Sequence, residues 1–237
     1  MKFALIGHPV AGSLSPVLFG AAYGNRHIYE LYDSASFAEC WQQFLGNYYG
    51  INVTAPYKQD AYARCLELSD NAAATGAVNL VLKDGLRGYN TDVDGVLYAL
   101  RGICGKTALV VGTGGAARAA IVAAAKMGFR VSVTGRSPEK VAMLEERFNL
   151  SHSAPACPDI VIYTLPGSAP VPSGLDLSSS VVLEANYRDP KLSDVPCMLY
   201  IPGVKWLMGQ AVAGYRLFTG EEPSVAAMEA ALEQFLQ

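Results

Sequence analysis

The sequence predicts an α/β protein with parallel sheets, divided into two domains with a cleft between them. Two observations carry this prediction. Short apolar segments alternate with helical patterns along the whole chain, as expected for strands joined by helices. Gly102 and Gly105 interrupt the alternation, and a second alternating unit begins after them. We therefore expect one domain over 1–101, joined by helices over about 206–237, and another over 102–205. A single continuous sheet is the alternative.

In the first half, serine and proline pairs and turn dipeptides mark the element boundaries. Ser15 is suited to cap a helix with Pro16 at its first position, and Asp84-Gly85 is a strong turn signal. Strands are expected over 2–7, 28–33, 51–54 and 77–82, and helices from Ser15, over 36–45, from Pro56, and from Thr91 or Asp92 to about Arg101.

In the second half, the apolar segments are more continuous, as expected for strands buried on both faces. Strands are expected over 107–111, 130–134, 159–165 and 181–187, an alanine-rich helix over 116–127, and two closing helices from about Lys205.

Composition excludes several classes of protein. Apolar residues make up 51% and charged residues 16%, a balance typical of a globular chain and not of a disordered one. The net charge of −3, without a basic cluster, argues against nucleic acid or anionic membrane partners. The apolar helical run 119–125 is far too short to span a bilayer. The N-terminal segment predicts a strand and not a signal peptide, so we expect a cytoplasmic protein.

Neither the cysteines nor the histidines form a recognisable ligand pattern. The five cysteines are scattered and never spaced as Cys-x-x-Cys, which indicates reduced thiols that mostly fill the core. His8, His27 and His152 lie far apart in sequence. We expect no metal site.

A glycine-rich turn follows the strand 107–111 and precedes the alanine-rich helix. Gly112-Thr113-Gly114-Gly115-Ala116-Ala117 fits G-x-G-x-x-A, a dinucleotide-binding pattern. Gly112 permits the tight turn, Gly114 lets the backbone approach a pyrophosphate, and Ala117 keeps helix and strand close. Gly115 and Ala116 lie at the helix N-terminus, whose N–H groups attract phosphates. The alternative is a turn that serves packing alone.

The second strand of this half predicts which dinucleotide binds. It ends at Thr134-Gly135-Arg136-Ser137, where NAD-binding proteins place an acidic residue for the ribose 2′-hydroxyl, and no acid is present. Arg136 and Lys140 are suited to a 2′-phosphate instead, which predicts NADP. Thr164 and Gly203 complete the expected cofactor-binding set. The alternative for Arg136 and Lys140 is a helix start with ordinary surface charges.

The first half carries polar residues at turns, strand ends and helix starts, where a purely structural domain would have fewer of them. Ser13-Leu14-Ser15-Pro16 puts two hydroxyls at a strand-to-helix turn, and Asn52-Val53-Thr54 is followed by Lys58. Asn90-Thr91-Asp92 opens a helix, preceded by Gly76-Ala77-Val78-Asn79. The structural alternatives are helix capping for the serines, backbone hydrogen bonds for Asn52 and Asn79, and a surface ion pair for Lys58 and Asp92.

Together these segments resemble the shikimate dehydrogenase family. The runs that match in the family's order are Gly7-His8-Pro9-Val10, Ser13 to Pro16, Asn52-Val53-Thr54 with Pro56 and Lys58, Gly76 to Asn79, Gly88 to Asp92, Gly112 to Ala117, and Gln210. The match spans nearly the whole chain. It implies a substrate-binding domain beside a Rossmann-type NADP-binding domain, and the reversible reduction of 3-dehydroshikimate to shikimate with NADPH, a step of aromatic amino-acid biosynthesis.

The resemblance also assigns roles to single residues. Ser13 and Ser15 would hold the substrate carboxylate, with Tyr187 assisting there. Asn52 joins the substrate-binding set, and Thr54, Asn79 and Gln210 would hydrogen-bond the ring hydroxyls. Lys58 and Asp92 would form the catalytic pair. An ammonium beside a ketone stabilises the charge that develops as hydride arrives and can deliver a proton, while a carboxylate orients it.

The chain departs from the family pattern at several positions. Gly12 replaces a histidine, Gly135-Arg136-Ser137 replaces an Asn-Arg-Thr run, and Lys205 and Trp206 replace a glycine and a methionine beside the expected nicotinamide. Three rival functions follow: a quinate/shikimate dehydrogenase of broader specificity, a catalytically idle ligand-binding member, and another NADP enzyme such as a folate dehydrogenase, which the paired serines disfavour. We expect a monomer or a homodimer.

Overall fold

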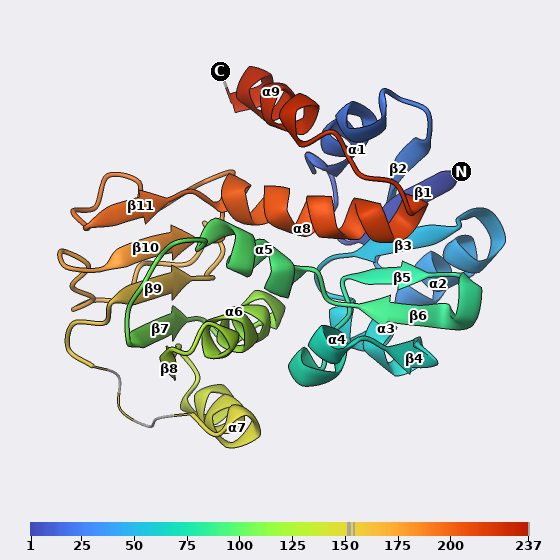
Figure 1. The fold of residues 1–237 in the computed structure, drawn as a ribbon. Coiled ribbons are helices and arrows are strands. Elements are labelled where there is room, and N and C mark those ends of the chain that lie inside the picture. The colour runs from blue at the N-terminus through green and yellow to red at the C-terminus, as the bar shows by residue number, and fades with distance from the viewer. Residues whose placement is uncertain (151–152, 154, 237) are drawn as a thin grey trace. The chain divides into compact units, whose positions relative to one another are not determined.

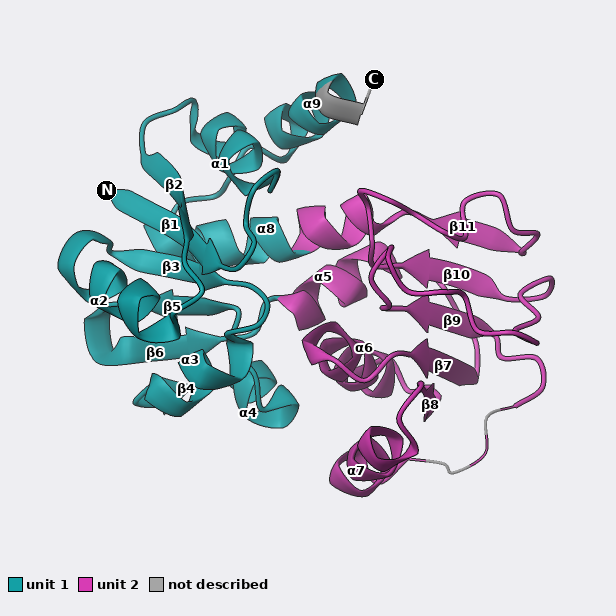
Figure 2. Ribbon diagram, turned by 180° about the vertical axis from the view of Figure 1, so that it is seen from behind, with its two compact units in different colours: residues 1–91, 210–237 teal, residues 92–209 magenta. Residues whose placement is uncertain are grey.

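The computed structural model describes residues 1–150, 153 and 155–236 and has the predicted α/β fold (Figure 1). Contacts divide the chain into two compact units (Figure 2). The first unit contains residues 1–91 and 210–237, so both ends of the chain contribute to it, and the second contains residues 92–209. None of the helices among the described residues has the length and apolarity needed to cross a membrane.

The first unit is built on a six-stranded sheet with strand order β2-β1-β3-β5-β6-β4. Its strands are β1 (Lys2–Gly7), β2 (Ile28–Asp33), β3 (Gly50–Val53), β4 (Glu67–Leu68), β5 (Leu80–Leu82) and β6 (Arg87–Tyr89). The expectation of parallel sheets is wrong for this sheet, because β5 pairs antiparallel with both β3 and β6. The reason is the short 3₁₀ turn Asp84–Leu86, which joins β5 directly to β6 as a hairpin.

Both faces of this sheet are apolar, as strand β1 illustrates. Alternate side chains of a strand point to opposite faces. Ala4 and Ile6 lie in a core cluster with Trp41 and Phe44 of α2. Phe3 faces the other way, where its ring stacks on Phe218 with centroids 4.7 Å apart. The helices of this unit are α1 (Ser15–Tyr23), α2 (Phe37–Asn47), α3 (Lys58–Arg64), α4 (Asp70–Thr75) and α9 (Val225–Leu236).

The second unit is built on a five-stranded, entirely parallel sheet with strand order β11-β10-β9-β7-β8. Its strands are β7 (Thr107–Val111), β8 (Arg130–Thr134), β9 (Ile160–Tyr163), β10 (Val181–Glu184) and β11 (Leu199–Ile201). The helices α5 (Asp92–Ala99), α6 (Gly115–Lys126) and α7 (Pro138–Phe148) belong here, and α8 (Gly203–Thr219) continues from this unit into the first.

Helix α5 belongs to the second unit, although the glycines that interrupt the sequence pattern come after it. Val93, Val96 and Leu100 are buried in one cluster with Ala120 of α6 and Trp206 of α8. The division between the units therefore falls between Thr91 and Asp92, and again between Gly209 and Gln210. Burial of an apolar helix stripe decides this division, whereas glycines mark only where a helix ends.

Several helix starts differ from the predicted ones. Leu14, not Ser15, is the N-cap of α1, and Ser15 is already the first helical residue. Helix α3 begins at Lys58 and not at Pro56, because the Tyr57 N–H donates to the Thr54 carbonyl in a turn that precedes the helix. Ser36 lies outside α2 as its N-cap and accepts from the Glu39 N–H at 3.3 Å.

Strand lengths differ as well. Three strands are shorter than predicted. Strand β5 begins inside the predicted range 77–82, strand β10 ends inside the range 181–187, and strand β9 is shorter than 159–165 at both ends. The sequence patterns did not predict β4, α4, β6 and β11, which contain two to six residues each. Such short segments contain too few residues to display a period.

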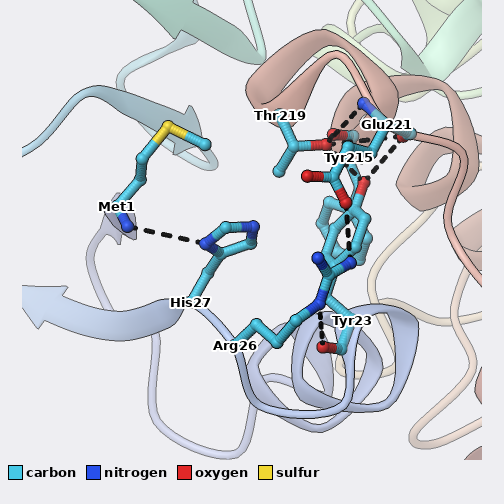
Figure 3. A network of polar contacts seen from close by, with 7 residues as sticks. All are labelled: Met1, Tyr23, Arg26, His27, Tyr215, Thr219 and Glu221. Carbon is cyan, nitrogen blue, oxygen red and sulfur yellow. Dashed lines mark hydrogen bonds and ion pairs between the residues drawn. The ribbon is translucent and has the colours of Figure 1, made fainter.

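In the first unit, hydrogen bonds and an ion pair join the N-terminal segment to the end of α8 and the segment that follows it. The Arg26 guanidinium pairs with the Glu221 carboxylate at 2.6 Å, and the Thr219 hydroxyl donates to the Tyr23 hydroxyl at 2.8 Å (Figure 3). Helix α9 packs against α1. These contacts bring the segment 210–237 back to the N-terminal sheet, where its polar residues meet those of the first 91 residues.

Candidate active site

Two serine hydroxyls lie side by side in the connection from β1 to α1. The Ser13 Oγ donates to the Ser15 Oγ at 3.1 Å, and the Ser15 N–H donates to the Ser13 Oγ at 3.2 Å. The Ser13 N–H donates to the Val10 carbonyl at 3.1 Å. The Val10 N–H in turn donates to the Asp33 carboxylate at 2.7 Å. Asp33 at the end of β2 therefore holds the loop that carries the two serines.

Ser15 does not occupy the capping position, because Leu14 is the N-cap of α1 and Ser15 is the first helical residue. The Ser13 Oγ accepts from the Ser15 N–H, so Ser13 does stabilise the start of the helix. Ser15 is buried. A buried hydroxyl is stabilised by hydrogen bonds, and the Ser15 Oγ accepts one from the Ser13 hydroxyl.

Asn52 and Thr54 lie at the carboxyl end of β3. The Asn52 amide is buried and uses both of its ends: Oδ1 accepts from the Tyr29 hydroxyl at 2.7 Å, and Nδ2 donates to the Asn79 carbonyl at 3.2 Å. Thr54 is half-buried, and its N–H donates to the Ile6 carbonyl at 2.9 Å. A Cβ on Gly7 would collide with the Thr54 methyl group, so the glycine makes room for this threonine.

Asn79 connects the strand β5 to helix α8. Its Oδ1 accepts from the Thr91 N–H at 2.8 Å, and its Nδ2 donates to the Gln210 Oε1 at 3.4 Å. The Thr91 hydroxyl lies 3.1 Å from the Asn79 Nδ2 and 3.5 Å from the Gln210 Oε1. Gln210 is 131 residues from Asn79 in sequence, so only the return of the chain through α8 brings them together.

These contacts form one polar network inside the first unit. The members, from one end to the other, are Ser13, Ser15, Tyr29, Asn52, Asn79, Thr91 and Gln210. Five of the residues predicted to bind substrate belong to it, and Thr54 follows Asn52 by two positions. The alternative, that these amides only satisfy backbone groups, explains the hydrogen bonds of Asn52 and Asn79 to backbone atoms. It does not explain their hydrogen bonds to other side chains.

Lys58 and Asp92 each open a helix next to this network along the chain. Lys58 is the first residue of α3, and its carbonyl accepts from the Val78 N–H at 2.9 Å, next to Asn79. Its side chain is half-buried. Asp92 directly follows Thr91, is the first residue of α5 and is buried, with 9% of its surface exposed. Asp92 also lies where the second unit begins.

The glycine-rich turn of the second unit contains two glycines of different kinds. Gly112 has a φ of 125°, and a Cβ there would collide with the Thr164 hydroxyl, so packing alone requires glycine. The Thr164 hydroxyl itself donates to the Val111 carbonyl at 2.9 Å. Gly114, in contrast, is exposed and in an extended conformation with φ −87°, and a Cβ there would meet no atom within 4 Å.

Packing among the described residues does not account for Gly114, because none of their atoms lies within 4 Å of a Cβ built there. Gly114 is the N-cap of α6, and it supplies no side chain to cap the helix. Gly115 and Ala116, the first two residues of α6, are half-buried, and Ala117 is fully buried against the sheet. The turn thus leaves open space in front of a helix N-terminus, which suits a phosphate group.

Arg136 and Lys140 are both exposed, one before α7 and one in its first turn. Ser137 is the N-cap of this helix and accepts from the Lys140 N–H at 3.4 Å. A helix does begin there, as the structural alternative supposed. The Gly112 N–H donates to the Thr134 carbonyl at 2.8 Å, so the end of β8 is tied directly to the glycine-rich turn.

Glu184 shapes the segment that carries Tyr187 through its carboxylate, and the surroundings of Gly203 through its backbone carbonyl. Tyr187 is half-buried in the segment after β10. Glu184, fully buried, accepts from the N–H groups of Lys191 and Leu192 at 2.7 and 3.1 Å, which shapes that segment. Gly203 opens α8 against the Glu184 carbonyl, which a Cβ would approach to 2.6 Å.

Sequence reasoning missed four polar residues that hold the predicted ones in place: Tyr29, Asp33, Thr91 and Glu184. Thr91 was noted as a possible helix cap and as part of the polar run Asn90-Thr91-Asp92, but it was given no role of its own. Tyr29 and Glu184 lie within strands, where an aromatic residue indicates core and a lone acid carries no signal. No group of three or more histidine, cysteine or acidic side chains among the described residues could hold a metal ion.

Comparison with known proteins identifies the family. A family model for the shikimate dehydrogenase substrate-binding domain matches residues 5–81. An NADP(+)-dependent shikimate dehydrogenase of Thermus thermophilus is 32% identical over 263 residues, covering 100% of this chain and 99% of the relative.

Solved structures agree with the sequence match. Shikimate 5-dehydrogenase from Thermus thermophilus, in complex with NADP(H) and shikimate, superposes with a TM-score of 0.88 at 31% identity, covering 99% of both chains. Quinate dehydrogenase from Corynebacterium glutamicum, in complex with NAD, gives a TM-score of 0.85 over 99% of both chains, but at 23% identity this likeness concerns the fold alone. With a full-length relative above 30% identity, the chain belongs to the shikimate dehydrogenase family.

Proposed function

We propose that this protein catalyses the reversible reduction of 3-dehydroshikimate to shikimate with NADPH. The observation that carries the proposal is the network from Ser13 to Gln210, which gathers hydroxyl and amide groups from four separate segments of one unit. A ligand with one carboxylate and several ring hydroxyls matches such a set of neutral hydrogen-bonding groups. The relative from Thermus thermophilus that bound shikimate supports the same choice.

The first unit would bind the substrate and the second the dinucleotide. Ser13 and Ser15 would donate to the carboxylate, with Tyr187 assisting. Asn52, Thr54, Asn79 and Gln210 would bind the ring hydroxyls. Hydrogen bonds to a charged group contribute about 1.5–3 kcal/mol each, so the two serines would supply much of the affinity.

Lys58 and Asp92 would carry the proton chemistry. NADPH, when bound, supplies the hydride. The Lys58 ammonium would stabilise the negative charge that develops on the ketone oxygen and deliver a proton to it. The Asp92 carboxylate would orient that ammonium and accept a hydrogen bond from a neighbouring hydroxyl of the substrate.

The second unit fits a dinucleotide at the turn between β7 and α6. Gly114 leaves space for a pyrophosphate, and the N–H groups of Gly115, Ala116 and Ala117 are available at the start of α6. Gly112, Thr164 and Gly203 would shape the turn and its surroundings. Arg136, exposed after β8, would bind a 2′-phosphate together with Lys140, which favours NADP over NAD.

One coupled assay tests the function. Purified protein is incubated with shikimate and NADP, and nicotinamide absorbance is followed, with quinate and with NAD in parallel reactions. Turnover that is fastest with shikimate and NADP supports the proposal. Equal or faster turnover of quinate would favour the broader quinate/shikimate dehydrogenase, and binding of shikimate without turnover would favour the idle member.

A further inference from the structure

Two polar side chains in the network, those of Tyr29 and Thr91, have no role in the proposed chemistry. Tyr29 projects from β2, the edge strand of the first sheet. Its ring packs on Phe19 with centroids 4.8 Å apart and on Tyr215 at 6.1 Å. Its hydroxyl therefore has a fixed place, because both neighbouring rings are themselves buried.

The Tyr29 hydroxyl is hydrogen-bonded to a residue that is expected to touch the substrate. It donates to the Asn52 Oδ1 at 2.7 Å. Burial raises the pKa of the Tyr29 phenol well above its usual value, while the nearby Ser15 hydroxyl lowers it. The phenol thus stays protonated and keeps one hydrogen to donate.

The direction of these hydrogen bonds follows from the partners. A carbonyl can only accept, so the end of the Asn52 amide that meets the Asn79 carbonyl at 3.2 Å must be Nδ2. The other end, Oδ1, then faces Tyr29 and needs a donor. The single hydrogen of Tyr29 is committed to Asn52.

We propose that Tyr29 is a positioning residue for substrate binding, which holds the Asn52 amide in one orientation. The inference rests on the proposed function for its effect on shikimate. Without the phenol hydrogen, the Asn52 Oδ1 becomes a buried acceptor without a partner. This cost favours rotation of the amide toward another donor. In the rotated amide, the second Nδ2 hydrogen of Asn52 would no longer point toward a bound ligand.

The test is Tyr29→Phe, which removes one hydroxyl and keeps the ring against Phe19 and Tyr215. We expect the KM for shikimate to rise about tenfold, with kcat within about twofold and the KM for NADP unchanged.

Tyr48→Phe is the matched control. The Tyr48 hydroxyl donates to the Glu30 carboxylate at 2.8 Å, and Glu30 lies next to Tyr29 on the same strand but points to the opposite face. Both variants lose one buried phenol hydrogen bond, so both should lower the melting temperature by a few degrees. Only Tyr29→Phe should change the KM for shikimate. An unchanged KM with an equal loss of stability would overturn the inference.

A measurement without substrate separates this inference from the proposed function. The side-chain amide of Asn52 gives a pair of ¹⁵N–¹H signals, which an Asn52→Ser variant assigns. Those signals should shift in Tyr29→Phe and not in Tyr48→Phe. If they do not move, Tyr29 does not position Asn52, whatever the enzyme turns over. If wild-type protein leaves shikimate unchanged but the signals shift, the proposed substrate fails while the positioning role stands.

Discussion

At the scale of single residues, the candidate site divides into groups that we propose touch the substrate and groups that hold them in place. Lys58 opens α3 and is half-buried, so its ammonium is partly withdrawn from water. In such surroundings a charge acts more strongly on a developing oxyanion than it would in bulk solvent. If the Lys58 ammonium is removed, water cannot readily take its place in these surroundings.

Lys58→Ala should therefore lower kcat by roughly 10²–10⁴-fold with little change in the KM for shikimate, as expected for a group that acts in the transition state. Lys83→Ala is the control, because Lys83 is an exposed lysine of the same unit just after β5. Steady-state rates with shikimate and NADP measure both variants. A kcat near that of wild type in Lys58→Ala would exclude the catalytic role.

Arg136 is the residue on which the preference between dinucleotides is expected to depend. Arg136→Ala should weaken NADP binding by about 1.5–3 kcal/mol, more than tenfold, and leave NAD binding unchanged, because only NADP carries the 2′-phosphate. Arg130→Ala is the matched control: Arg130 is exposed at the first position of β8, whereas Arg136 follows the other end of that strand. Titration of both nucleotides decides, and equal affinity of wild type for NAD and NADP would contradict the prediction.

At the scale of elements, the β7–α6 turn contains one glycine that the fold requires and one that we propose serves a ligand. Gly112 is fixed by its own backbone conformation and by Thr164, so substitution there acts on stability. Gly114 has an ordinary conformation and open space at its Cβ. Two glycines of one motif are thus expected to respond differently to mutation.

Gly114→Asp tests that difference. Aspartate is a good N-cap, so the melting temperature should stay the same or rise. NADP binding should fall by at least tenfold, because a carboxylate at the start of α6 competes with the phosphates for the same N–H groups. Gly112→Ala should instead lower the melting temperature. Calorimetry gives both quantities, and unchanged NADP affinity in a folded Gly114→Asp protein would remove the turn from the cofactor site.

At the scale of the whole molecule, the N-terminal amine lies beside His27 in the first unit. It is 3.5 Å from the His27 Nδ1 (Figure 3), and the imidazole ring packs against Phe3 and Tyr23. Desolvation lowers the pKa of His27, and the N-terminal ammonium and Arg26 lower it further. The folded protein therefore binds a proton here less readily than the unfolded chain, whose histidine titrates near 6.5.

The sign of the pH dependence follows from linkage. The contribution of His27 is fully present above about pH 6.5 and is lost as the pH falls through its lower folded pKa. The free energy of unfolding in urea should therefore fall between pH 7.5 and 5.5, and His27→Phe should reduce that fall. The carboxylates with lowered pKa, such as Asp33 and Asp159, titrate below this window. An identical fall in the variant would show that His27 does not titrate in the folding equilibrium.

Local sequence was sufficient for the segment from β7 to β8 of the second unit. Strands β7 and β8 occupy the predicted residues, and the glycine motif lies directly between β7 and α6. The motif itself occupies six consecutive residues. Backbone conformation and burial over so short a span depend on near neighbours, which is what hydrophobic period and glycine spacing report.

The polar network of the first unit was decided by tertiary structure. The sequence indicated that Ser13, Asn52, Asn79 and Gln210 were unusual, but not which of them would touch. That depended on the antiparallel entry of β5 beside β3, and on the return of α8 from residue 210, neither of which any local pattern encodes.

Tyr29 illustrates the limit most clearly. In sequence it is one more aromatic residue in a strand, and its function depends on the Asn52 amide 23 residues away. Strand order places β1 between β2 and β3, and the side chain has to reach across it. A hydrogen bond between distant segments is set by strand order and side-chain direction, which are properties of the folded chain, whereas period and composition describe only whether a residue is buried.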